Sequence, residues 1–219
     1  MRNVSRHTWI QDLPENVCYI FLYDKQDYIA AEERFDGISL NAKYEGKGVR
    51  FGEKLYRYYK YVQDNAPYHN AKYVVKMDDD VVLCPKRLFP FLKNQNVNSK
   101  TYAGWFHNPD LKKVGYHHRS DEMFVLIGKL LMNRIVSKRY CHNQNQKTCD
   151  NLGHLFDTNY GGTSLGLWLS KMSDVNELQM NSVCEDLRNS NTRLNSQTTL
   201  LFHPTKTLQK AKEKYLNCQ

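Results

Sequence analysis

Residues 73–83 of this chain read Y-V-V-K-M-D-D-D-V-V-L, so three consecutive aspartates lie between two β-prone runs. Carboxylates this close repel one another, and a chain tolerates them where solvent or a divalent cation compensates the charge. Alternate residues of an extended chain share one side, so Asp78 and Asp80 present their oxygens together. Such ligands suit Mg²⁺ or Mn²⁺, which can bridge to substrate phosphates. A solvated acidic turn is the alternative. The preceding strand favours a metal–diphosphate site, because binding groups in open α/β sheets gather at the carboxyl ends of strands.

Strands and helices are predicted to alternate around this stretch. The expected strands cover residues 17–22, 73–77, 101–105, 122–127 and 198–202. The expected helices cover residues 25–35, 51–63, 85–93, 165–172, 185–193 and 207–216, and the glycine pair 161–162 opens the fourth of them. This alternation favours an α/β sheet of nucleotide-binding type flanked by helices. The chain has no internal repeat and no Pro/Ser-rich linker, so residues 1–219 are predicted to form a single domain.

The net charge of the chain indicates which kinds of molecule it could bind. The formal net charge is +8, and a basic surface attracts polyanions, among which nucleic acid is the obvious candidate. The basic residues are scattered, however, and the chain carries no zinc-finger spacing or aromatic ribonucleoprotein motif. The phosphates of a nucleotide-sugar would also exploit such a surface.

Cysteine usage leaves the compartment open. The six cysteines occupy positions 18, 84, 141, 149, 184 and 218, and none forms a C-x-x-C pair. An even number of separated cysteines is compatible with disulfides in an oxidising lumen, and buried free thiols fit almost as well. Cys141 and Cys149 bracket a polar loop that is short enough to be closed by a disulfide. The sequon Asn3-Val4-Ser5 is a weak secretory signal.

The sequence lacks any stretch approaching the roughly twenty apolar residues that span a bilayer. It also begins without the pattern of a cleavable signal peptide. If the protein works in the secretory pathway, we expect its anchor to lie outside this chain.

Two features beyond the aspartates could carry chemistry. The acidic pair Glu185–Asp186 could supply a general base, or it could mark a helix N-terminus, where negative charge favours the dipole. His203 follows an apolar strand candidate, and a neutral imidazole is a competent Mn²⁺ ligand beside carboxylates. A lone histidine at a strand end is more often structural.

Two further features could bind phosphate. Arg2 and Arg6 precede Trp9 and could hold a diphosphate, or they could pack their stems on the core and bridge to surface carboxylates. Gly161 and Gly162 could let the backbone approach a ligand at a helix N-terminus, or they could form a plain turn.

Taken together and in this order, these segments resemble those of the β1,3-galactosyltransferase / β1,3-N-acetylglucosaminyltransferase family of Golgi enzymes. The similar blocks are R-x-x-x-R-x-T-W at residues 2–9, K-M-D-D-D-V at 76–81, Y-G-G with L-S between 160 and 170, C-E-D-L at 184–187, and His203 after the closing strand. The resemblance spans almost the whole chain, and its specificity lies in the order and spacing of the blocks.

The resemblance implies a GT-A-like glycosyltransferase domain that binds a UDP-sugar through Mn²⁺ or Mg²⁺ and transfers the sugar with inversion. Asp80 is then the best candidate for a metal ligand, and His203 is a candidate second ligand. Asp78 and Asp79 are expected to contact ribose, sugar or metal.

The same resemblance assigns the other candidates. Asp186 is the expected catalytic base, with Glu185 as the alternative. Arg2, Arg6 and the glycine pair 161–162 are expected at the nucleotide-binding end. The implied reaction moves galactose or N-acetylglucosamine to a glycan acceptor on a glycoprotein or glycolipid, in β1,3 linkage. The implied place is the Golgi lumen, with type II membrane association and no nucleic-acid partner.

The chain departs from the family at residues 187–190, which read L-R-N-S without the usual valine and nearby glycine, and at 160–166, which lack the usual aromatic. These departures leave room for a catalytically silent relative that binds nucleotide-sugar or glycan. The net charge alone suggests another alternative, a basic nucleic-acid-binding protein.

Overall fold

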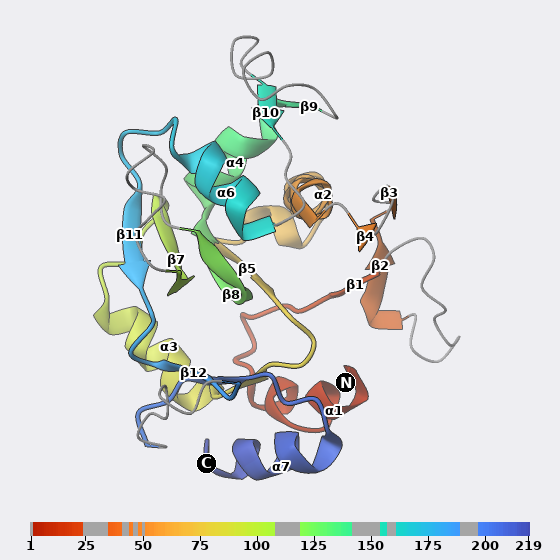
Figure 1. The fold of residues 1–219 in the computed structure, drawn as a ribbon, viewed down its shortest axis with the longest axis vertical. Helices are drawn as coiled ribbons and strands as arrows, with labels where there is room; N and C mark the ends of the chain where they lie inside the picture. The colour runs from red at the N-terminus through yellow and green to blue at the C-terminus, as the bar shows by residue number, and fades with distance from the viewer. Residues whose placement is uncertain are drawn as a thin grey trace.

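The structure is a computed structural model and describes residues 2–23, 35–40, 44–45, 48–49, 51–107, 119–141, 154–156, 161–188 and 197–219. It is a mixed α/β fold whose sheets are flanked by helices (Figure 1). The predicted α/β class is therefore confirmed. No helix within the described ranges is long and apolar enough to cross a membrane.

The central sheet has four strands. In spatial order they are β11 (Asn176–Gln179), β7 (Thr101–Phe106), β8 (Ser120–Gly128) and β5 (Tyr73–Met77). β11 runs parallel to β7, whereas β8 pairs antiparallel with both β7 and β5. The register places Met77 opposite Phe124. This register brings the start of β8 beside the aspartates that follow β5.

Each face of this sheet supports a hydrophobic core, because side chains of a strand alternate between its two faces. Val125 and Ile127 of β8 belong to one core, and Phe124 and Leu126 belong to the other. Three helices pack on the first face: α2 (Phe51–Asp64), α4 (Lys129–Val136) and α6 (Gly161–Leu169). The apolar spacing predicted for residues 51–63 is confirmed in α2, which buries Leu55, Tyr59 and Val62.

A second sheet covers the other face. Its three strands are β12 (Cys184–Asp186), β13 (Leu201–His203) and β6 (Val82–Leu83), in that order. β12 runs parallel to β13, and β13 runs antiparallel to β6. The helices on this side are α1 (Arg2–Arg6), the 3₁₀ helix η1 (Trp9–Asp12), α3 (Pro85–Asn94) and α7 (Leu208–Leu216). The sheet thus joins a segment from the first half of the chain to two segments near its C-terminus.

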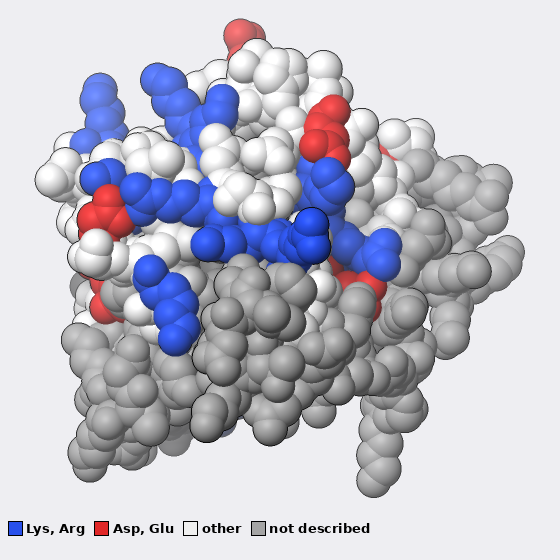
Figure 2. All heavy atoms as spheres, turned by 90° about the horizontal axis from the view of Figure 1, so that it is seen from above, with Lys and Arg blue, Asp and Glu red and all other residues white. Residues whose placement is uncertain are grey.

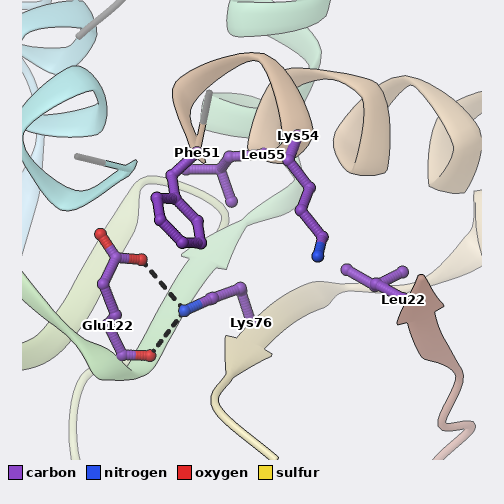
Figure 3. Close-up of a pocket in the computed structure, with 6 residues that line it drawn as sticks. All are labelled: Leu22, Phe51, Lys54, Leu55, Lys76 and Glu122. Atoms are coloured by element: carbon purple, nitrogen blue, oxygen red, sulfur yellow. Dashed lines mark hydrogen bonds and ion pairs between the residues drawn. The ribbon is translucent and has the colours of Figure 1, made fainter. Parts of the chain in front are cut away.

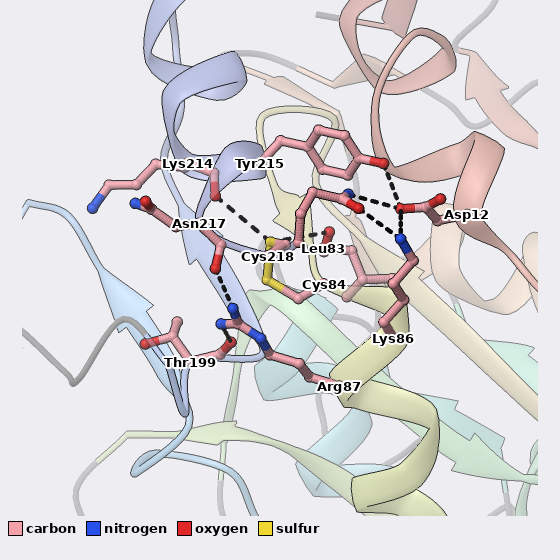
Figure 4. Close-up of a disulfide and its surroundings, with 11 residues drawn as sticks. Asp12, Leu83, Cys84, Lys86, Arg87, Thr199, Lys214, Tyr215, Asn217 and Cys218 are labelled. Carbon is pink, nitrogen blue, oxygen red and sulfur yellow. Dashed lines mark hydrogen bonds and ion pairs between the residues drawn. A yellow bond between two sulfur atoms is a disulfide. The ribbon is translucent and has the colours of Figure 1, made fainter.

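A disulfide between Cys84 and Cys218 ties the start of α3 to the end of α7 (Figure 4). Around it, Tyr215 donates a hydrogen bond to Asp12, and Arg87 donates one to the carbonyl oxygen of Asn217. The N-terminal α1 also packs against α7. These contacts fix the C-terminal helix beneath the three-stranded sheet.

The remaining elements are short. They are the parallel pair β1 (Phe21–Tyr23) and β2 (Gly37–Ser39), the antiparallel pair β3 (Tyr44–Glu45) and β4 (Gly48–Val49), the parallel pair β9 (Arg139–Cys141) and β10 (His154–Phe156), and the 3₁₀ helix η3 (Tyr68–Asn70).

Some predicted boundaries were wrong. The strand expected at 17–22 is confined to β1, because only Phe21–Tyr23 pair with β2. The helix expected at 185–193 is wrong in its described part, since Cys184–Asp186 forms a strand that pairs with β13. α6 ends at Leu169 rather than at 172, and the closing strand begins at Leu201 rather than at 198.

Several predictions fall outside the described residues. These are residues 25–34 of the helix expected at 25–35, the loop bracketed by Cys141 and Cys149, Tyr160, and residues 189–190 of the departure from the family.

Candidate metal centre

Three predicted site residues lie close together just beyond the end of strand β5. Asp78 and Asp80 lie in the turn after β5, and His203 is the last residue of β13. Nε2 of His203 lies 3.2 Å from Oδ1 of Asp80 and 3.7 Å from Oδ2 of Asp78. One ligand atom from each residue lies within 4.8 Å of the other two. Among the described residues, this is a group of side chains that can hold a metal ion. Asp79, between the two carboxylates, is exposed.

Backbone pairing explains how His203 reaches the aspartates. β13 pairs with β6, which begins two residues after Asp80. Just beyond β13, the amide and the hydroxyl of Thr205 both donate hydrogen bonds to the carbonyl oxygen of Asp80, at 2.8 and 2.7 Å. The end of β13 and the aspartate turn are therefore held together by backbone contacts.

The donor set fits a divalent cation. The His203 side chain is 7 % exposed, whereas those of Asp80 and Asp78 are 19 % and 33 % exposed. The imidazole is thus the buried member of the group, and the two carboxylates are its partly exposed members. Nδ1 of His203 is buried without a hydrogen-bond partner in the described part of the chain, so the ring's polar contacts run through Nε2 toward the carboxylates. An imidazole nitrogen with two carboxylate oxygens is a usual set for a first-row divalent ion.

Asp186 lies on the same side of the second sheet as His203. The parallel register pairs Asp186 with His203 and Glu185 with Phe202, and paired residues point to the same face. Asp186 therefore neighbours the metal group, and Glu185 faces the opposite side. Neither residue begins a helix, so the helix-terminus alternative is wrong for this pair.

Arg188 holds the Asp186 carboxylate from both sides. Its Nε donates to Oδ1 at 2.9 Å and its Nη2 donates to Oδ2 at 3.0 Å. Partial burial raises the pKa of Asp186, but these hydrogen bonds outweigh it and hold the pKa below its ordinary value. Asp186 is thus kept ionised next to His203.

Glu185 faces helix α7. Its Oε1 lies 3.4 Å from Nζ of Lys214, and the same ammonium lies 4.8 Å from the centre of the Phe202 ring. This contact joins β12 to α7 on the side away from the aspartates.

A further acid–histidine pair borders the site. Asp121, near the start of β8, lies 3.1 Å from Nε2 of His107, and Arg188 lies 3.9 Å from the same Asp121 oxygen. Burial raises the pKa of Asp121, but His107 and the amide of Met123 outweigh it and lower the pKa to about 2. The sequence prediction missed this residue. The acidic pair at 121–122 directly before an apolar strand was the available signal.

The glycine pair lies at the N-terminus of α6, but the anion there is Glu122. Its Oε1 accepts a hydrogen bond from the amide of Gly162 at 2.5 Å, and its Oε2 lies 3.0 Å from Nζ of Lys76 (Figure 3). Lys76 also lies 2.6 Å from Oδ1 of Asp78. The glycines thus connect to the metal group through two charged side chains.

A small pocket opens beside this network. Its volume is about 30 Å³, which is room for a water molecule or two rather than for a nucleotide. Its lining residues are Leu22, Phe51, Lys54, Leu55, Lys76 and Glu122.

The N-terminal arginines are engaged with the protein itself. Arg6 forms two hydrogen bonds to the carboxylate of Asp36, at 2.8 and 2.7 Å, and its guanidinium lies over Phe21. The Arg2 guanidinium lies 4.5 Å from the centre of the Tyr23 ring. Both residues therefore join α1 to the β1–β2 pair, as the packing and bridging alternative described.

Comparison with known proteins assigns the chain to no family. No protein-family model matches the chain, and no curated protein matches its sequence.

Proposed function

We propose that this protein is a metal-dependent, inverting hexosyltransferase that moves galactose or N-acetylglucosamine from a UDP-sugar to a glycan acceptor in β1,3 linkage. The observation that carries the proposal is the group of Asp78, Asp80 and His203, whose members come from opposite halves of the chain. These are the residues that the resemblance assigns to a metal–diphosphate site. The two-core α/β fold, with its carboxylates at the end of β5, supports a GT-A-like architecture.

Asp78, Asp80 and His203 would hold Mn²⁺ or Mg²⁺. A bound ion of this kind neutralises charge on a departing diphosphate. The carboxylates are partly exposed to solvent, where the phosphates of a donor can approach them. His203 is buried and lies on the protein side of the site.

Asp186 is the proposed base. Its position beside His203 places it at the metal group, whereas Glu185 faces α7. An ionised carboxylate there can accept the proton of the acceptor hydroxyl as the new C–O bond forms at the anomeric carbon. Inversion requires the base and the leaving UDP to lie on opposite faces of the sugar.

The pairing of Asp186 with Arg188 favours a second candidate function. A carboxylate with a lowered pKa and both oxygens occupied is a weak base until the arginine moves away. A catalytically silent relative that binds nucleotide-sugar or glycan would keep the metal group and leave this pair closed.

The Cys84–Cys218 disulfide supports an oxidising compartment such as the Golgi lumen, because disulfides are rare in reducing compartments.

A band of Lys and Arg side chains crosses one face of the described part of the molecule (Figure 2). This band favours the alternative of a nucleic-acid-binding protein. Its binding to a polyanion would weaken steeply with salt and would need no divalent ion.

Calorimetric titration of UDP into the full chain, with and without Mn²⁺, tests the proposal. We expect Mn²⁺-dependent binding that is lost in Asp80→Asn and kept in Asp64→Asn, which alters a carboxylate that pairs only with Lys60 on the surface of α2 among the contacts described. Transfer assays with UDP-galactose and UDP-N-acetylglucosamine then separate the enzyme from the silent relative. Metal-independent UDP binding, or none by the folded chain, would refute the proposal.

A further inference from the structure

All three N–H donors of the Lys76 ammonium have acceptors next to the metal group. An ammonium has three N–H donors, and Nζ of Lys76 lies within hydrogen-bonding distance of three acceptors. These are Oδ1 of Asp78 at 2.6 Å, the carbonyl oxygen of Glu122 at 2.8 Å and Oε2 of Glu122 at 3.0 Å. The Lys76 side chain is 17 % exposed, so these contacts are largely shielded from water.

The two oxygens of Asp78 have different partners. Oδ1 accepts from Lys76, and Oδ2 is the atom that faces Nε2 of His203. The contact with Lys76 therefore fixes the rotation of the Asp78 carboxylate and leaves Oδ2 directed into the metal group.

Glu122 is itself held in place by α6. Its Oε1 accepts the amide hydrogen of Gly162 at the N-terminus of the helix, where the dipole favours an anion. This approach depends on the glycines. A Cβ on Gly162 would lie 2.0 Å from the carbonyl oxygen of Ser120, and a Cβ on Gly161 would lie 3.0 Å from Oε2 of Glu122.

Charge alone does not account for a lysine at this place. An ammonium so close to a ligand carboxylate opposes the binding of a divalent cation through Coulomb repulsion. The geometry of Lys76 instead explains its presence by orientation, because it directs one oxygen of Asp78 while occupying the other.

We propose that Lys76 and Glu122 are positioning residues of the cation site, which transmit the placement of the α6 N-terminus to the Oδ2 atom of Asp78. This inference rests on the metal centre of the proposed function, and it assigns Gly161 and Gly162 to the support of that centre rather than to phosphate binding.

Direct titration of Mn²⁺ into the full chain tests the proposal through Lys76→Met, which keeps the length of the stem and removes the donors. We expect Mn²⁺ affinity to fall by about tenfold to a hundredfold, as it does when a residue that orients a metal ligand is replaced. Glu122→Gln should weaken binding in the same direction, because its amide offers one acceptor oxygen where Glu122 uses two. Lys60→Met removes an exposed lysine that pairs with Asp64, and it should leave the affinity unchanged.

The direction of the change separates the explanations. Tighter Mn²⁺ binding in Lys76→Met would mean that the lysine acts only as a repelling charge, and unchanged affinity with a lower melting temperature would mean that it only supports the fold. Either result overturns the proposal while leaving the metal centre intact. If Lys76→Met does not fold, Glu122→Gln decides the question, because unchanged Mn²⁺ affinity in that folded variant would overturn the proposal. Absence of Mn²⁺ binding by the wild-type chain would overturn the metal centre and this proposal together.

Discussion

Thr205 donates two hydrogen bonds to the carbonyl oxygen of Asp80, one from its amide and one from its hydroxyl. Thr205 is fully buried and lies two residues after His203. One residue thereby fixes the distance between the backbone of one candidate metal ligand and the strand that carries another. The metal group is held by its backbone as well as by its side chains.

Thr205→Val should lower both stability and metal affinity. The substitution keeps the shape of the side chain and removes the hydroxyl donor, so the free energy of unfolding should fall by about 1 kcal/mol. Thr207→Ala is a matched control, because the Thr207 side chain accepts the amide hydrogen of Lys210 at the start of α7. Loss of that cap costs about 1 kcal/mol and should leave Mn²⁺ affinity unchanged. Equal Mn²⁺ affinities in both variants would contradict a role for Thr205 in the site.

Asp186→Asn should abolish the proposed base, while Glu185→Gln should leave transfer nearly intact, because only Asp186 shares a face with His203. Sugar transfer by Asp186→Asn should be slower by about 10²- to 10⁴-fold. The measurement is product formation from the UDP-sugar that the wild-type chain accepts. A rate loss confined to Glu185→Gln would reverse the assignment.

The pairing of Asp36 with Arg6 should make stability depend on pH. Hydrogen bonds from Arg6 outweigh burial and lower the pKa of Asp36 below its ordinary value of 3.8. The unfolded chain therefore takes up the proton first as the pH falls. The stabilisation is complete well above pH 3.8 and is lost as the pH drops through the lowered folded value.

Unfolding of the wild-type chain and of Asp36→Asn by denaturant, measured between pH 7 and pH 2, checks this expectation. The difference in free energy of unfolding should be about 2 kcal/mol at pH 7 and should shrink below pH 4. A difference that stays constant across this range would show that the ionised carboxylate contributes nothing.

Removal of the Cys84–Cys218 disulfide should lower the free energy of unfolding by about 2–5 kcal/mol, because the bridge closes a long loop in the unfolded chain. The double variant Cys84→Ala, Cys218→Ala tests this by thermal melting. Cys18→Ser is the control, since Cys18 is an exposed free thiol. Similar melting temperatures for the double variant and the control would be the contrary result.

Gly162→Ala should be far more damaging than Gly161→Ala. At Gly162 the new Cβ meets a backbone oxygen at 2.0 Å, whereas at Gly161 it meets the end of a side chain at 3.0 Å. We expect a loss of about 3 kcal/mol or more for the first variant and a smaller loss for the second. Chemical denaturation of both variants decides the order, and equal losses would mean that the N-terminus of α6 can shift away from Ser120.

The sequence predicts best where a local pattern suffices. Tyr73–Met77 forms the strand expected of it, because an apolar run ends at a charged triplet. Helix α2 follows from the spacing of its buried residues. Asp78 and Asp80 were expected as cation ligands from their local spacing after a strand, whereas only the resemblance of separate blocks joined His203 to them.

The remainder of the site depends on pairings that are not encoded locally. Glu185 and Asp186 carry the charge of a helix start, yet tertiary pairing with β13 makes them part of a strand. The contacts of Lys76 with Glu122 follow from the antiparallel register of β5 and β8. A shift in that register would remove them without changing the strand propensity of either segment.

The disulfide described above also constrains how the protein can be made. Cys84 and Cys218 are 134 residues apart, so a ribosome that adds 5–20 residues per second produces the second thiol roughly 7–27 seconds after the first. Cys18 has already been synthesised by then, and Cys184 emerges before Cys218. Oxidation in order of emergence would therefore pair the wrong thiols. Correct maturation requires either that oxidation waits for Cys218 or that thiol–disulfide exchange repairs the early pairs.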